Sequence, residues 1–140
     1  MHRMMRWGVG TAVMVIAMGG WAAAEGPFSA LNRTANDAHT PVIDAPESVK
    51  AGEPFKVTIT VGKTPHPSLA EHAVQWIALY AGDVELARAT LTPVVTRPSV
   101  TFTIVLDQST TLRALEQPNH AAAWEAVKKI TVTTEEKKQP

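Results

Sequence analysis

The chain has 140 residues, enough for one hydrophobic core and too few for two sizeable domains. Its 13 basic and 13 acidic residues balance, so no excess positive charge favours nucleic acid or an anionic membrane surface. The absence of cysteine excludes disulfides, c-type haem attachment, thiolate nucleophiles and cysteine-ligated zinc or iron–sulfur sites. Chemistry at a functional site must therefore use imidazole, carboxylate or hydroxyl groups.

The N-terminus has the layout of a secretory signal peptide. Arg3 and Arg6 precede an apolar run, residues 7–24, which ends in small residues before Glu25. A membrane anchor is the alternative, because the run approaches the ~20 residues that span a bilayer. The alanine ending favours cleavage, so residues 1–24 are interpreted as a signal peptide. The mature chain is then periplasmic or otherwise exported, is not inserted in the membrane, and has 11 basic against 13 acidic residues.

The mature part divides into an arm, one domain and a tail. Residues 25–38 mix Gly, Pro, Ser and Asn without a sustained period, which predicts an irregular N-terminal arm. Residues 39–134 form the predicted domain. Residues 135–140 are a charged tail.

Alternation of apolar and polar side chains predicts strands throughout the domain. Residues 55–61 alternate strictly, as a half-buried strand does, and residues 73–80 are apolar on both faces, as in a covered central strand. Further short strands are predicted at residues 86–91, 99–106, 111–115 and 129–133. The alanine-rich residues 121–127 predict one helical turn. About seven short strands separated by turns indicate an all-β, immunoglobulin-like antiparallel β-sandwich.

Four histidines of the mature chain lie in or beside predicted loops: His39, His66, His72 and His120. A single histidine in a loop is usually a surface residue. Four of them, with none elsewhere in the mature chain, indicate a metal site, because imidazole ligands have to converge from several loops. His66 and His72 flank a loop that Pro67 stiffens, directly before the predicted central strand.

Short motifs around these histidines follow one another in a distinctive order. They are His39-Thr40-Pro41-Val42-Ile43, Gly52-Glu53-Pro54-Phe55, Val61-Gly62-Lys63, Pro65-His66-Pro67, Glu71-His72, Trp76-Ile77-Ala78-Leu79-Tyr80 and Pro118-Asn119 through Trp124-Glu125. Over residues 39–132 this series resembles the superoxide reductase family (desulfoferrodoxin and neelaredoxin). The resemblance implies a non-haem iron (Fe2+/Fe3+), held by four imidazoles and one axial cysteine thiolate, that reduces superoxide at an open sixth position. His39, His66 and His72 match the first three imidazole ligands.

The last motif departs from the family pattern. Where the family has Cys-Asn-x-His-Gly-x-Trp, this chain reads Pro118-Asn119-His120-Ala121-Ala122-Ala123-Trp124. In this register Pro118 takes the thiolate position and Ala121 the position of the fourth imidazole, with His120 one residue early. The sequence leaves open whether His120 reaches the metal. The family's Glu-Lys pair before the first histidine is replaced by Asp37-Ala38, so the lysine that attracts superoxide is missing.

Loss of the thiolate predicts weaker iron binding at a higher potential. Copper and zinc become alternatives to iron, because ferrous iron lies low in the Irving–Williams order. Two functions follow: an exported superoxide-reductase-like iron protein, or a non-catalytic metal-binding or carrier module that has lost turnover. A purely structural sandwich similar to the sulfur-oxidation carrier proteins ranks third, because their reactive cysteine motif is absent.

The expected partners are superoxide or another small anion and an electron donor that the sequence does not identify. A homo-oligomer is compatible with the sequence. Trp76 and Tyr80 are expected in the core, and Trp124 beneath the metal loop. Glu71 and Asp37 are candidates for carboxylates that orient the imidazoles, with a solvated role as the alternative.

Overall fold

A computed structural model describes residues 26–134, which form eight β-strands and no helix. The predicted signal peptide (residues 1–24) and charged tail (residues 135–140) lie outside the described residues. The strands are β1 (Pro41–Asp44), β2 (Ser48–Lys50), β3 (Phe55–Val61), β4 (Val74–Ala81), β5 (Val84–Thr90), β6 (Ser99–Ile104), β7 (Thr110–Pro118) and β8 (Trp124–Thr133). Within the described range, no helical segment has the length and hydrophobicity to cross a membrane.

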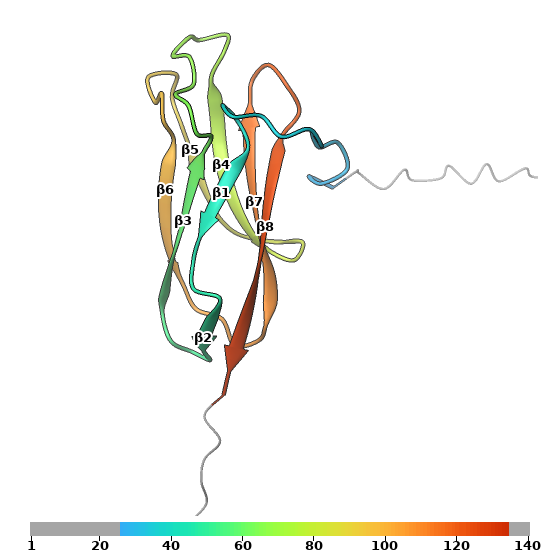
Figure 1. The fold of residues 1–140 in the computed structure, drawn as a ribbon, viewed down its shortest axis with the longest axis vertical. Helices are drawn as coiled ribbons and strands as arrows, with labels where there is room; N and C mark the ends of the chain where they lie inside the picture. Colours follow the sequence, from blue (N-terminus) through green and yellow to red (C-terminus); the bar gives the residue numbers. More distant parts are fainter. Residues whose placement is uncertain (1–25, 135–140) are drawn as a thin grey trace, which may run out of the picture.

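The strands form two facing sheets (Figure 1). One sheet has three antiparallel strands in the order β1-β3-β6. The other has five strands in the order β2-β8-β7-β4-β5, in which the short β2 pairs with β8 in parallel and the remaining pairs are antiparallel. The predicted all-β, immunoglobulin-like sandwich is confirmed.

The helical turn predicted for residues 121–127 is wrong. Trp124 already begins β8, and it pairs with Glu116 of β7. Residues 119–121 make a bend between the two strands. Pairing along β7 outweighs the helix preference of the alanines, because intrinsic propensity is weak compared with tertiary context.

The main core lies between the sheets. Alternate side chains of β3 point into it, as the sequence predicts, and these are Phe55, Val57, Ile59 and Val61. The other buried members are Ile43, Val74, Ile77, Leu79, Leu112, Ala114 and Ile130. Burial of these side chains supplies the main hydrophobic driving force for the sandwich.

A smaller cluster covers the outer face of β4. Its buried members are Ala78, Tyr80 and Leu115, and the partly buried side chains packed against them are Phe28, Leu31 and Trp76. Phe28 and Leu31 belong to the N-terminal arm. The arm therefore supplies the second covered face that the apolar sequence of β4 requires.

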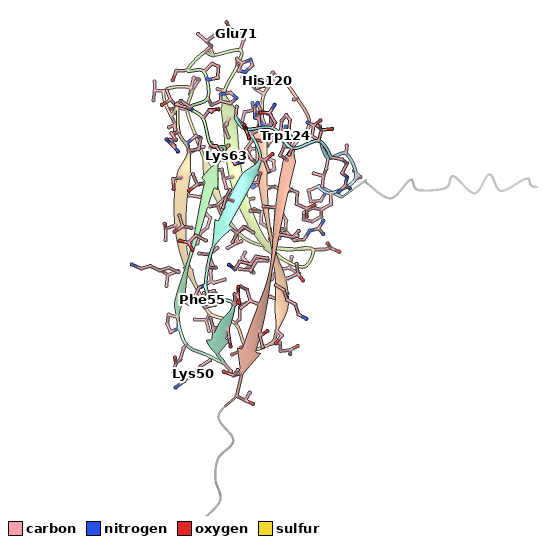
Figure 2. The ribbon with its side chains drawn as sticks, in the orientation of Figure 1. Lys50, Phe55, Lys63, Glu71, His120 and Trp124 are labelled. Carbon is pink, nitrogen blue, oxygen red and sulfur yellow. The ribbon has the colours of Figure 1, made fainter. Side chains whose placement is uncertain are left out.

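The loops that carry the histidines gather at one end of the sandwich, called the histidine end below. His39 precedes β1, His66 and His72 lie between β3 and β4, and His120 lies between β7 and β8. Figure 2 shows Glu71 and His120 at this end and Lys50 at the opposite end. Loops far apart in the sequence thus meet in one place.

Gly62 lets two of these loops approach each other at the backbone. Its φ is 68°, and a Cβ on it would lie 2.6 Å from the carbonyl oxygen of Ala38 and 2.7 Å from that of Asp37. Its amide donates to the carbonyl oxygen of Thr40 at 3.1 Å. Glycine is required on both counts, because it alone tolerates this φ freely and leaves room for the opposing backbone. The turn before His39 is thereby held against the end of β3.

Gly62→Ala is expected to destabilise the metal-free protein by roughly 3 kcal/mol, because left-handed strain adds to a backbone collision. The matched control is Gly82→Ala. Gly82 has a φ of 57° and nothing within 4 Å of its Cβ position, so its loss should be limited to strain of about 1–2 kcal/mol. Urea unfolding measures both, and equal losses would contradict the proposed collision.

Candidate metal centre

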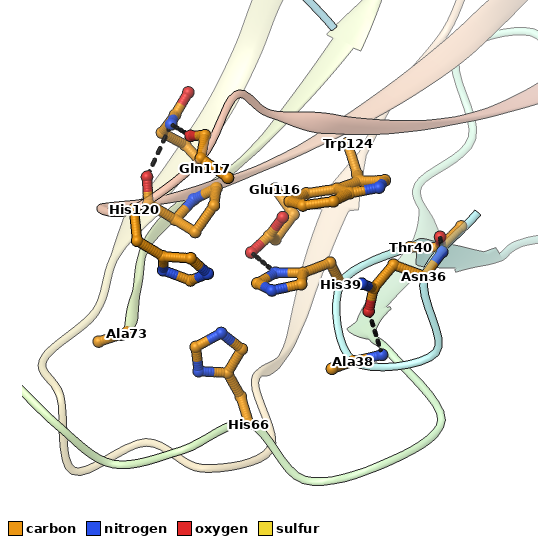
Figure 3. Close-up of polar contacts among 12 residues, drawn as sticks. Asn36, Ala38, His39, Thr40, His66, Ala73, Glu116, Gln117, His120 and Trp124 are labelled. Atoms are coloured by element: carbon orange, nitrogen blue, oxygen red, sulfur yellow. Dashed lines mark hydrogen bonds and ion pairs between the residues drawn. The ribbon is translucent and has the colours of Figure 1, made fainter. Parts of the chain in front are cut away.

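Four imidazoles converge at the histidine end. One ring nitrogen from each lies within 4.8 Å of the others, and the residues are His39, His66, His72 and His120. His39 and His66 are buried, His72 is partly buried and His120 is exposed. Figure 3 shows the rings of His39, His66 and His120 directed toward a common space. The structure therefore brings together all four histidines that the sequence singled out.

The tautomer of His66 is set by its own loop. Its Nδ1 lies 3.0 Å from the carbonyl oxygen of Pro67, which can only accept a hydrogen bond, so Nδ1 carries the hydrogen. Nε2 therefore holds a lone pair, and this nitrogen is buried without a hydrogen-bond partner. An unsatisfied buried acceptor is costly. A metal ion among the four imidazoles would satisfy it, so the residues present fit a metal.

His39 is held by a turn and by an aromatic stack. The carbonyl oxygen of Asn36 accepts hydrogen bonds from the amides of His39 and Thr40 at 3.1 and 2.8 Å. The indole of Trp124 stacks on the imidazole, with ring centroids 4.2 Å apart and planes 8° apart (Figure 3). The indole Nε1 donates to the carbonyl oxygen of Thr34 at 2.9 Å. Trp124 thus packs against the site, in agreement with the sequence-based expectation.

A buried carboxyl group that sequence reasoning missed contacts His39. Glu116 of β7 is fully buried, and its Oε1 lies 3.0 Å from Nδ1 of His39, whereas its Oε2 has no partner. When Nε2 of an imidazole ligates a metal, Nδ1 carries a hydrogen, and here Glu116 is placed to accept it. The alternation of side chains along β7 could have indicated that Glu116 is buried. Leu112 and Ala114 point into the core, and residue 116 lies on the same face of the strand.

The two carboxylates suggested from the sequence, those of Asp37 and Glu71, are exposed to solvent. Asp37 is exposed and pairs with the exposed Lys63 at 3.6 Å. Glu71 is also exposed. Among the described residues, the carboxyl group hydrogen-bonded to an imidazole of the cluster is that of Glu116.

Asn119 joins the loop of His120 to the loop of His72. Its Nδ2 donates to the carbonyl oxygen of Ala70 at 2.7 Å, and its Oδ1 accepts from the amide of Ala73 at 3.0 Å. Its own amide donates to the carbonyl oxygen of Ala73 at 3.0 Å. The rings of His72 and His120 stack beside this junction, with centroids 3.7 Å apart. The one-residue shift in the motif therefore still brings His120 into the cluster.

The two substituted positions of this motif offer no ligand. Pro118 is fully buried at the end of β7, and Ala121 is partly buried in the bend. Gln117 fixes both, since its Nε2 donates to the carbonyl oxygens of Pro118 at 2.7 Å and of Ala121 at 3.0 Å (Figure 3). The donor set present is therefore made of imidazole nitrogens.

Burial disfavours the charged forms of His39, His120 and Glu116. Burial first, and then the neighbouring His66, His120 and His72, lowers the pKa of His39 to about 4. Burial, followed by His72 and His66, also lowers the pKa of His120. Burial raises the pKa of Glu116 to about 8. Neutral imidazole is the form that ligates metals, and it suits iron, copper and zinc.

Comparisons with known proteins agree with the motifs. The family model described as desulfoferrodoxin matches residues 32–127. A relative from Thermotoga maritima, provisionally named a superoxide reductase, is 37% identical over 113 residues, which cover 67% of this chain and 86% of the relative. The solved superoxide reductase (neelaredoxin) of Ignicoccus hospitalis is 43% identical with a TM-score of 0.62, over 68% of this chain and 81% of that one.

A more distant neighbour shares the fold alone. It is a sulfur carrier protein from Chlorobium limicola, with a TM-score of 0.52 and 18% identity over 67% of this chain and 79% of that chain. At this identity the likeness reaches the sandwich architecture and says nothing of the site.

Glu116→Ala is expected to weaken Zn2+ binding by about 10–100-fold, because Nδ1 of His39 loses its partner. Glu116→Gln should lose less, because its amide oxygen still accepts a hydrogen bond. Competition with a chromophoric chelator measures both. Glu71→Gln is the control: it removes an exposed carboxylate at the same end and should leave affinity unchanged, whereas an equal loss there would point to a general charge effect.

Proposed function

The chain belongs to the desulfoferrodoxin family, and on this premise we propose that it is an exported metal-binding protein of the superoxide reductase type. In this proposal the four imidazoles hold one non-haem iron ion, with copper or zinc as alternatives. Superoxide is the small anion that reaches the site. The signal-like residues 1–24 support export to the periplasm or an equivalent compartment.

One observation carries the metal-binding part of the proposal. Nε2 of His66 is buried with a free lone pair, and its ring belongs to a group of four imidazoles that each place one nitrogen within 4.8 Å of the others. A neighbouring imidazole could donate a hydrogen bond to this lone pair. The nitrogen that donates would then carry a hydrogen and could not itself act as a metal ligand. A bound cation satisfies all four lone pairs at once.

Family membership and donor chemistry favour different metals. The resemblance implies iron, while nitrogen donors alone bind Cu2+ and Zn2+ more tightly than Fe2+. A bound iron would supply one-electron chemistry toward superoxide, and an electron donor would have to return the electron. The chain's own residues hold the ligands in place: Glu116 and Trp124 position His39, and Asn119 positions His120.

The site lacks the thiolate and the lysine of the family pattern but has a fourth imidazole. The thiolate and the lysine are absent at Pro118 and Ala38, whereas His120 supplies the fourth imidazole. If each loss raises the barrier by ~2–3 kcal/mol, the iron-loaded protein reacts with superoxide roughly 10³–10⁴-fold more slowly than a five-ligand relative.

A non-catalytic metal-binding or carrier module is the second candidate. The complete absence of cysteine favours it, because no thiolate is available to tune the metal. A purely structural sandwich like the sulfur carriers ranks last, because its support is limited to the fold and the reactive cysteine is missing.

The mature protein is expected to bind one divalent ion per chain. Alanine replacement of any of the four histidines should lower Zn2+ affinity at least tenfold, with the largest loss for the buried His66. Titration with Fe2+, Cu2+ and Zn2+, together with the metal content of protein from its native compartment, measures this. Metal-free protein that binds none of the three ions would overturn the proposal.

Pro118→Cys is expected to introduce the thiolate-to-iron charge-transfer absorption that the iron-loaded wild type should lack. No change at Ala121 is needed, because His120 already completes the four imidazoles. Pulse radiolysis should show faster reaction with superoxide for this variant, and Pro118→Ser is the control without a thiolate. A wild-type rate near the diffusion limit, unaffected by the cysteine, would show that imidazoles alone suffice.

A further inference from the structure

Within the N-terminal arm, residues 26–36 are bonded to the loop that carries His120. Leu31 forms an isolated parallel bridge with Ala123. The amide of Asn32 donates to the carbonyl oxygen of Ala123 at 2.8 Å, and the side-chain Nδ2 of Asn32 donates to that of Ala122 at 2.7 Å. Both carbonyl groups lie within three residues of His120. In Figure 1 the arm runs beside the ends of β7 and β8.

The same arm continues directly to His39. The carbonyl oxygen of Thr34 accepts the indole hydrogen of Trp124, whose ring stacks on the imidazole of His39. Two residues later, Asn36 caps the turn that presents His39, and its Oδ1 accepts from the amide of Ala38 at 2.8 Å. One short segment therefore bonds to the supports of two imidazoles that lie 81 positions apart in the chain.

The outer end of the arm is fixed by an aromatic side chain. The ring of Phe28 lies edge-to-face on Tyr80, with centroids 5.0 Å apart, and the guanidinium carbon of Arg113 lies 3.3 Å from the Phe28 centroid. Arg113 is itself bonded to Asp83 at 2.6 Å. The family match begins at residue 32, so Phe28 lies outside it.

Covering β4 does not account for all of these contacts. Phe28 and Leu31 bury the outer face of β4, and apolar packing of this kind needs no hydrogen bond to a loop. The two donors of Asn32 are directed instead at the backbone of the His120 loop. His120 itself is exposed, so packing holds it less firmly than it holds the buried His39 and His66.

We propose that the arm is part of the framework of the metal site, and that Asn32 is a positioning residue that holds His120 within reach of the other three imidazoles. This inference rests on the proposed metal binding. Asn32 touches no imidazole and acts through the backbone of residues 122 and 123.

Asn32→Ala in the full mature protein is expected to weaken Zn2+ binding about tenfold, measured by chelator competition. Asn32→Asp, which keeps the shape but removes the Nδ2 donor, should lose a similar factor and serves if the alanine variant folds poorly. Arg33→Ala, at the position next to Asn32, is the matched control. The side chain of Arg33 is 75% exposed and lies 4.0 Å from that of Glu125, so the Zn2+ affinity of this variant should equal that of wild type.

A double-mutant cycle separates positioning from a general effect on stability. In a His120→Ala background, Asn32→Ala should cost nothing further, because the imidazole it positions is gone. In a His72→Ala background the tenfold loss should persist. Wild-type affinity in Asn32→Ala, or a loss that persists without His120, would overturn the inference while leaving metal binding intact. Absence of Zn2+ binding by the wild type would overturn the proposed function and this inference together.

Discussion

Burying an imidazole nitrogen that carries a lone pair and has no hydrogen-bond partner, Nε2 of His66, is the constraint on which the histidine end depends. His39 and His66 each use one ring nitrogen for a protein partner, the carboxyl group of Glu116 and the carbonyl oxygen of Pro67. The other nitrogen of each ring is left facing the cluster. Burying a ring nitrogen without a hydrogen-bond partner costs free energy of folding, and the rest of the domain must offset this cost. The hydrogen bonds between the surrounding loops contribute to that offset.

Close backbone approach and hydrogen bonds to the backbone assemble the loops. Gly62 brings the end of β3 against the turn before His39, and Asn119 ties the His120 loop to the residues on both sides of His72. These contacts sit on a sandwich whose core lies between the sheets. The core is therefore separate from the histidine end, where a few polar residues place the imidazoles.

Local patterns in the sequence were sufficient for the fold and for the histidines. The strict alternation of residues 55–61 identifies β3, because side-chain parity is written into consecutive residues. The partnership of Glu116 with His39 could not be found in this way, since it joins positions 77 apart. The sequence left open whether His120 joins the other imidazoles, because this depends on the bonds that Asn119 makes to another loop. The helical turn predicted at residues 121–127 is wrong because the strand from Trp124 pairs with β7. The arm is held in place by single side chains and backbone hydrogen bonds. Its sequence therefore has no repeating apolar pattern from which its position could be predicted.

The gradient of burial across the four imidazoles has a kinetic consequence. His39 and His66 are buried, whereas His72 is partly exposed and His120 is open to solvent. An incoming chelator or carrier can therefore meet a bound ion first on the side of His72 and His120. An ion held by all four imidazoles would still have His39 and His66 as ligands while the outer pair was displaced. The inner pair would then govern the residence time of the ion, and the outer pair would govern its accessibility to other molecules.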